Sequence, residues 1–308
     1  METSLEGFAD RLEVTRWRAV LRASGSLRLP AFRGALWHSV VGAALKRLVC
    51  TVPPGLCEPC PRQNACPYPA LFEARAGATG GPFPPGARIP NALWFDPGGW
   101  RAETVEPGRT FAIAYAVAGR AELASLVDEA IRRAAAAGLG RGRVTAAVER
   151  VESQSAPVGA AARRAVALAQ GGLALELRSP LRLKRGGTYL KALDPVALAR
   201  DLAFRLAALG HYHQGLPWPA PWRAALEEAA AVRVTDARTR WVESARYSAR
   251  QGRRIVMGGL MGRVRLEGVG PALAALLGAG TVIHAGKGAS VGLGEYRVLA
   301  GAATGGEG

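Results

Sequence analysis

The sequence predicts an α+β fold of two ferredoxin-like (RRM-like) units in tandem. Strand-like and helix-like segments follow one another in a similar order in both halves of the 308 residues. Each half approximates the order strand, helix, strand, strand, helix, strand, which is typical of a ferredoxin-like unit. Apolar residues make up 49% of the chain, enough to form real hydrophobic cores.

The N-terminal unit is expected to span residues 1–155. A cysteine-rich insertion at 50–66 and an insertion rich in Pro and Gly at 77–108 interrupt it. Hydrophobic periodicity predicts its regular elements, which are a strand at 13–23, a helix at 35–49, a short strand at 92–95, a strand at 110–117, a helix at 121–137 and a strand at 143–152.

The C-terminal unit is expected to span residues 170–300, after a weak linker at 153–170 and before a flexible tail at 301–308. Its predicted elements are a strand at 173–178, a helix at 195–209, strands around 232–247 and 255–266, a helix at 271–277 and a strand at 281–285.

A glycine-rich loop lies between the predicted strand at 281–285 and the apolar segment that begins at Tyr296. Glycine permits positive φ and a close approach of backbone N–H groups to an anion, so this loop is a candidate phosphate-binding element. The alternative is a hairpin whose glycines serve packing alone. Nucleotide hydrolysis is disfavoured because the only lysine of the loop is followed by glycine rather than Ser or Thr. The candidate RNA-binding residues here are Gly286, Lys287, Gly288, Gly292 and Gly294.

Charge indicates a phosphate-rich partner. The chain has 40 Lys and Arg against 24 Asp and Glu, a net charge of +16, which favours nucleic acid. Nine arginines and two acids lie between Arg233 and Arg265, interleaved with Trp241 and Tyr247. This combination suits single-stranded or looped RNA, although a solvated basic strand face is the alternative. Four of these arginines are candidate RNA ligands: Arg246, Arg250, Arg253 and Arg254.

The sequence predicts a soluble, cytoplasmic protein. Residues 1–10 lack the charged and apolar regions of a secretory signal, and no run of eighteen apolar residues occurs. No membrane partner is therefore expected.

All four cysteines, Cys50, Cys57, Cys60 and Cys66, fall in one window with the spacing C-x6-C-x2-C-x5-C. Such clustering favours a metal site over disulfides, with structural zinc as the first choice. An iron–sulfur cluster uses the same ligands, and thiols without metal are the remaining alternative. A four-thiolate site has no open position, so its metal would not take part in catalysis.

Three segments in a fixed order carry a family resemblance. The first segment comprises residues 29–36, which lead into the predicted helix, and residues 66–73, which follow the cysteines. The second is Arg246-Tyr247-Ser248-Ala249-Arg250-Gln251 with the glycines of 258–262, and the third is the glycine-rich loop. Together they resemble the CRISPR-associated precursor-RNA processing endoribonucleases, the sixth Cas family within the RAMP superfamily.

The resemblance implies a tandem ferredoxin-like protein that binds CRISPR repeat RNA and cuts it without a catalytic metal. The family's reaction is attack of a ribose 2′-hydroxyl on the adjacent phosphate, leaving a 2′,3′-cyclic phosphate and a 5′-hydroxyl. It needs a base, an acid and positive charge near the phosphate. A noncatalytic CRISPR RNA-binding subunit, working with other Cas proteins of an interference complex, is the alternative.

His38 is the first candidate for acid–base catalysis, because family members commonly carry a catalytic histidine on or near this helix. Lys46, two helical turns further on, could face the same groove and stabilise phosphate charge. Arg33, in the first of the three segments, is a further candidate RNA ligand. His284 enters the glycine-rich loop, where packing is slightly favoured over RNA contact, and His211 and His213 are expected to be surface decoration.

Overall fold

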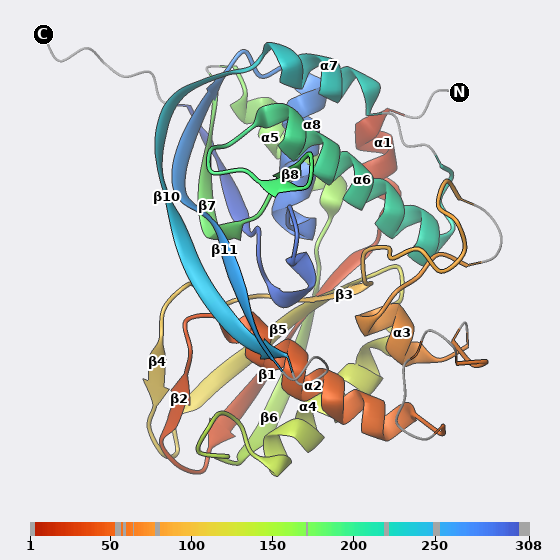
Figure 1. The fold of residues 1–308 in the computed structure, drawn as a ribbon, viewed down its shortest axis with the longest axis vertical. Coiled ribbons are helices and arrows are strands. Elements are labelled where there is room, and N and C mark those ends of the chain that lie inside the picture. Colours follow the sequence, from red (N-terminus) through yellow and green to blue (C-terminus); the bar gives the residue numbers. More distant parts are fainter. Residues whose placement is uncertain are drawn as a thin grey trace, which may run out of the picture.

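The computed structural model describes residues 4–52, 57, 60–63, 65–77, 81–170, 172–218, 222–248 and 253–301. For 244–248 and 253–256 the description covers the backbone. Within these residues the chain forms two four-stranded antiparallel sheets with helices packed on them (Figure 1). The tandem ferredoxin-like fold predicted from the sequence is confirmed.

The N-terminal sheet has the strand order β3-β5-β1-β6, formed by Leu93–Phe95, Thr110–Ala118, Val14–Ala23 and Ala146–Ser155. Helices α2 (Arg33–Val49) and α4 (Ala124–Ala137) pack on one face and bury it in a hydrophobic core. Side chains alternate between the two faces of a strand. Leu93 and Phe95 therefore join this core, whereas Trp94 between them joins the core of the C-terminal half.

The insertions of the N-terminal half add small elements around this sheet. A short two-stranded sheet pairs β2 (Leu27–Leu29) with β4 (Glu103–Val105). Helix α3 (Pro67–Phe72) follows the cysteine-rich segment, begins with Pro67 and packs against α2. A short 3-10 helix, η1 (Ala121–Leu123), leads into α4.

The C-terminal sheet has the order β10-β11-β7-β12, formed by Arg233–Ser248, Arg253–Glu267, Leu173–Leu181 and Tyr296–Ala300. The β10–β11 hairpin is long and reaches across to the N-terminal half beside α2 (Figure 1). A small hairpin of β8 (Lys184–Arg185) and β9 (Thr188–Tyr189) precedes α6 (Pro195–Gln214). Helix α7 (Arg223–Ala231) leads into β10.

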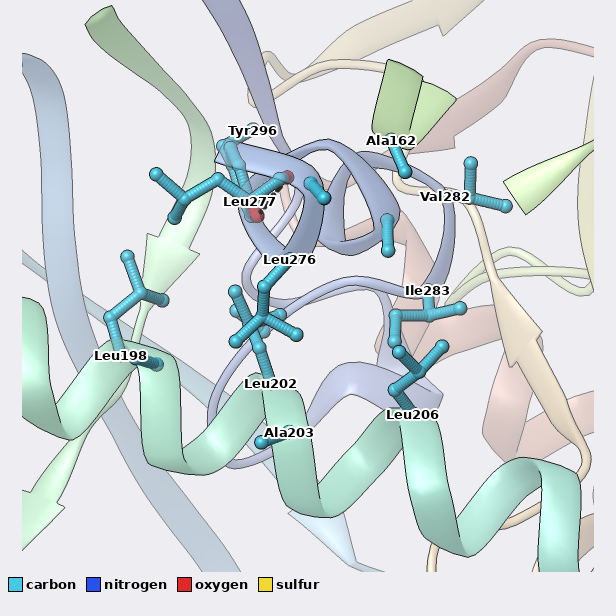
Figure 2. Packing of buried hydrophobic residues seen from close by; sticks show 14 of the residues in the cluster. Ala162, Leu198, Leu202, Ala203, Leu206, Leu276, Leu277, Val282, Ile283 and Tyr296 are labelled. Carbon is cyan, nitrogen blue, oxygen red and sulfur yellow. Dashed lines mark hydrogen bonds between the residues drawn. The ribbon is translucent and has the colours of Figure 1, made fainter. Parts of the chain in front are cut away.

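Helix α8 (Pro271–Ile283) lies at the centre of the larger hydrophobic core. Leu276 and Ile283 of α8 meet Leu202 and Leu206 of α6, and Tyr296 of β12 lies against α8 beside them (Figure 2). The Tyr296 hydroxyl donates a 2.6 Å hydrogen bond to the carbonyl of Leu277. This core also takes in α1 (Leu5–Arg11) and α5 (Val158–Leu168), so the N-terminal helix packs with the C-terminal half.

Two predictions on local structure are wrong. The strand predicted at 281–285 does not form, because α8 continues to Ile283 and the glycine-rich loop therefore follows a helix. The β-branched Thr281, Val282 and Ile283 favour a strand locally, but burial of Val282 and Ile283 in the core overrides that preference. The expected linker at 153–170 instead contains the end of β6 and α5.

No helix among the described residues has the length and apolar character needed to cross a bilayer. The domain boundaries predicted from the sequence stay predictions.

Candidate active site

His38 lies in the second turn of α2, half-buried between aromatic side chains. The edge of its ring meets Phe72 of α3 at a centroid distance of 5.0 Å, and Phe95 of β3 lies 6.4 Å away. Edge-to-face contacts of this kind restrict the orientation of a ring. Three elements distant in sequence thus position this histidine.

Lys46 lies on the same side of α2 as His38. Eight residues separate the two, which corresponds to about 12 Å along a helix axis. The Lys46 ammonium lies 5.4 Å from the centre of the Tyr68 ring, and Tyr68 stacks on Phe72 with a centroid distance of 5.4 Å. An aromatic run of Tyr68 and Phe72 on α3 therefore connects the two candidate residues.

The glycine-rich loop, residues 284–295, packs directly against this part of the N-terminal half. Gly34, one turn before His38 on α2, lies so close to the carbonyl of Val291 that a Cβ would collide with it. A Cβ on Gly292 would lie 2.8 Å from the carbonyl oxygen of Phe95. Gly34 lies one turn before His38 on α2, and Phe95 contacts the His38 ring. The glycine-rich loop therefore packs against residues that surround His38.

Most backbone N–H groups of the loop bind protein acceptors. The amide of Gly286 donates to the Asp201 carboxylate at 2.6 Å, that of Gly292 to Ala289 at 2.9 Å and that of Gly294 to Pro180 at 3.1 Å. All four loop glycines have positive φ, between 71° and 95°. These glycines hold the shape of the loop, and its lysine, Lys287, is exposed.

Comparison with known proteins places this architecture in a family. Residues 175–296 match the family model of the CRISPR-associated endoribonuclease Cas6, and residues 12–172, just over half of the chain, match a model described as an N-terminal domain. The chain is a CRISPR-associated Cas6-type protein. No curated protein matches its sequence.

Solved Cas6 structures share the fold at low sequence identity. A product complex of Cas6 (TTHB231) superposes with a TM-score of 0.55 at 16% identity, covering 93% of this chain and 100% of that one. Cas6 (TTHB231) of Thermus thermophilus gives 0.55 at 14% identity, with 94% and 99% covered. A chain of a partial Cas6-RT-Cas1–Cas2 complex superposes with a TM-score of 0.54 at 13% identity. The match covers 94% of this chain and 46% of that one.

The candidate arginines of this Cas6-type protein that the structure describes lie in two settings. Arg33, at the start of α2, donates to the Glu103 carboxylate at 2.6 Å and to the carbonyl of Arg101 at 3.1 Å. Arg246 lies on β10, with Arg253 and Arg254 opposite the end of that strand on β11, where the hairpin approaches α2. Arg250 lies outside the described residues.

The other three histidines have structural surroundings. His284 follows α8 with a positive φ of 62° and is 1% exposed, and burial together with Arg205 and Arg16 lowers its pKa to about 3. His213 is also buried, and its Nε2 lies 2.7 Å from the carbonyl of Pro90 while burial lowers its pKa to about 4. His211 contacts the carbonyl of Leu216 at 2.9 Å through Nδ1. The preference for packing at His284 is borne out, whereas the expectation of a surface His213 is wrong.

The cysteines do not form a metal-binding group in the part of the chain that the structure describes. Cys50, Cys57, Cys60 and Cys66 are unbridged, and Cys50 is exposed with its thiol 3.0 Å from the carbonyl of Val52. The pKa of the Cys57 thiol is raised, first by burial and then by Glu73. The described positions of the thiols therefore give no support to a structural zinc.

Sequence reasoning missed the aromatic residues around the candidate histidine. Phe72 and Phe95 contact His38 and Tyr68 stacks on Phe72, yet these residues come from two separate parts of the chain, α3 and β3. Tyr68 and Phe72 lie within residues 66–73, the part of the family-like segment that follows the cysteines, and this position was the available signal.

Proposed function

We propose that this protein binds CRISPR repeat RNA and cleaves it by attack of a ribose 2′-hydroxyl on the neighbouring phosphate. The observation that carries the proposal is His38, half-buried and oriented by Phe72 and Phe95 in a chain of the Cas6 endoribonuclease family. A histidine has an ordinary pKa near neutrality and can give or take a proton in such a step.

In this mechanism His38 transfers a proton at one end of the reaction. As a base it removes the proton of the 2′-hydroxyl, whose oxygen then bonds to phosphorus. As an acid it protonates the 5′-oxygen that leaves. In either role water exchanges the other proton, and the products are a 2′,3′-cyclic phosphate and a 5′-hydroxyl.

Lys46 supplies charge further along the same face of α2. Its distance of about two helical turns from His38 favours a role at the RNA backbone next to the cut over a role at the reacting atoms. Its ammonium lies 5.4 Å from the centre of the Tyr68 ring, and such a cation–π contact restricts its position. We infer that Lys46 stabilises a phosphate of the bound strand.

The basic surface supports the choice of RNA as substrate. Lys287 is exposed on the glycine-rich loop, and the arginine-bearing β10–β11 hairpin reaches α2 from the other half of the chain (Figure 1). Backbone-directed contacts of this kind position a nucleic acid without reading its sequence. We infer that the loop and the hairpin hold the repeat while His38 acts on it.

The test is cleavage of the cognate repeat RNA by the full chain in EDTA, with the product ends identified by mass spectrometry. A cyclic-phosphate end is expected. Tight repeat binding with no product at any pH would overturn the catalytic proposal and favour a noncatalytic RNA-binding subunit. Copurification with several Cas proteins, without binding of free repeat, would point to a subunit of an interference complex.

Zinc at the four cysteines stays a prediction from their spacing alone. Elemental analysis of protein purified without added metal measures it directly, with one zinc per chain as the predicted result. Stoichiometric iron with visible absorption would replace zinc by a cluster, and absence of both would leave free thiols. In either loaded form the role would be structural, since four thiolates leave no open position.

A further inference from the structure

A basic pocket lies on the C-terminal half, between α6, the β8–β9 hairpin and the glycine-rich loop. Its volume is about 360 Å³. In Figure 1 the β8 hairpin lies beside α6 above the loop, consistent with this position. A cavity of this size is in the range of small-ligand sites and is large enough for a single nucleotide.

Cations outnumber acids in the lining of the pocket. Lys184, Arg185, Arg200 and Lys287 are all exposed there, against the two carboxylates of Asp194 and Asp201. The first three come from two elements that precede the glycine-rich loop by a long stretch of chain, so the fold brings the charges together.

Both carboxylates already have partners. Asp194 pairs with Arg185 at 2.9 Å and accepts the Ala197 amide at the start of α6 at 3.0 Å. Asp201 accepts the amide of Gly286 at 2.6 Å, and burial raises its pKa. Among the described residues neither acid forms an ion pair with Lys184, Arg200 or Lys287, so the pocket keeps an excess of positive charge.

A buried arginine beside the pocket adds to this excess. Arg182 is only 8% exposed, and its Nε is buried with no hydrogen-bond partner within the described chain. Its guanidinium lies 4.4 Å from the centre of the Tyr189 ring, and the ammonium of Lys184 lies 4.6 Å from the same centre. Burying a cation without a counterion is costly, and an anion in the neighbouring pocket reduces that cost.

The pocket also offers an apolar wall. Val196, Ala197 and Phe204 of α6 line one side of it, and Leu183 lines another. Cations with an apolar, partly aromatic wall match a nucleotide, whose phosphate needs charge and whose base needs a flat apolar contact.

We infer that this pocket binds one phosphate-bearing nucleotide of single-stranded RNA, at a place separate from the His38 site. The glycine-rich loop joins the two places, since Val291 touches Gly34 of α2 while Lys287 lines the pocket. The identification of this nucleotide as part of the repeat RNA rests on the proposed function. Its chemistry, a nucleotide phosphate, does not depend on cleavage.

The experiment compares the double variant Lys184→Ala/Arg200→Ala with wild type in equilibrium binding of repeat RNA across a salt series. Both residues are exposed, so the variant is expected to fold, and its thermal midpoint checks this. Loss of charged contacts should weaken binding about tenfold or more. It should also reduce the salt slope, by roughly 0.7 for each lost phosphate contact on a single strand. Arg164→Ala removes an exposed arginine of α5 and should leave binding and slope unchanged.

A second arm uses adenosine 5′-monophosphate as a probe and follows thermal stabilisation of the full chain. Stabilisation of wild type but not of the double variant supports the nucleotide pocket, even if the protein neither cleaves nor binds the repeat. Repeat binding that is equal in the double variant and wild type, with the same salt slope, overturns the assignment to RNA. If the double variant keeps both wild-type RNA binding and stabilisation by the monophosphate, the pocket is not a nucleotide site.

Discussion

Gly34 of α2 lies against the carbonyl of Val291, so that the first turn of the candidate catalytic helix and the glycine-rich loop meet without a side chain between them. This contact joins the two halves of the chain beside His38. It ties the geometry of the proposed site to the packing of the C-terminal half.

Gly34→Ala should therefore destabilise the protein and lower its cleavage rate. Alanine favours a helix by up to about 1 kcal/mol over glycine, but here its Cβ meets a backbone carbonyl that cannot move alone. Overpacking of this kind costs roughly 1–3 kcal/mol, so the net effect is loss of stability. Thermal unfolding and single-turnover cleavage measure the two effects.

Gly77→Ala is the matched control, because nothing lies within 4 Å of a Cβ built there. Its stability and cleavage rate are expected to equal those of wild type. A Gly34→Ala protein with a wild-type midpoint and rate would show that the loop and α2 can separate without consequence.

His38→Ala should lower the cleavage rate by about 10²-fold or more and leave repeat affinity largely intact, as expected for loss of a positioned acid or base. Single-turnover cleavage at saturating protein measures the rate, and equilibrium binding measures the affinity. Wild-type cleavage by this variant would remove His38 from the mechanism. His284 would then be reconsidered, although it is buried and its pKa is lowered to about 3.

Two comparisons control the His38 result. Lys46→Ala should lower the rate less, because neighbouring arginines can partly replace a point charge and Lys46 lies about two turns away. His211→Ala changes a histidine on another helix and should leave the rate unchanged.

Some of this arrangement could be predicted from the sequence and some could not. Strand alternation and helix periodicity are local, so β1, β5, α4 and the order of elements in both halves are close to prediction. The contact of Gly34 with Val291 and the aromatic setting of His38 depend on packing between distant segments. No local pattern encodes them. The length of α8 was missed for the same reason, since burial decides it.

Two variants of the glycine-rich loop distinguish the contribution of its packing from that of its charge. A valine at Gly292 would require positive φ and would meet the carbonyl of Phe95, so Gly292→Val should lower the thermal midpoint and weaken repeat binding together. Lys287→Ala should weaken binding alone and less, because it removes one exposed charge. A Gly292 variant with normal folding and wild-type binding would show that this glycine has no part in RNA recognition.

The Glu295 carboxyl makes stability depend on pH. It lies mostly buried at the end of the loop, with Oε2 lacking a hydrogen-bond partner among the described residues. Burial and then the charge of Asp96 raise its pKa to about 7, against the opposing effect of Arg178 and other arginines. The folded protein therefore binds this proton more tightly than the unfolded chain, and stability falls as pH rises from about 4.5 to about 7.

Glu295→Gln removes this loss because glutamine stays neutral. The variant should be more stable than wild type at pH 8, by a free energy of unfolding on the order of 1–3 kcal/mol, and should show little or no gain at pH 4.5. Chemical denaturation at the two pH values measures the difference. Glu106→Gln changes an exposed carboxyl and should show no such gain. If Glu295→Gln has the same advantage at both pH values, the effect comes from packing, and the buried carboxyl does not titrate in this range.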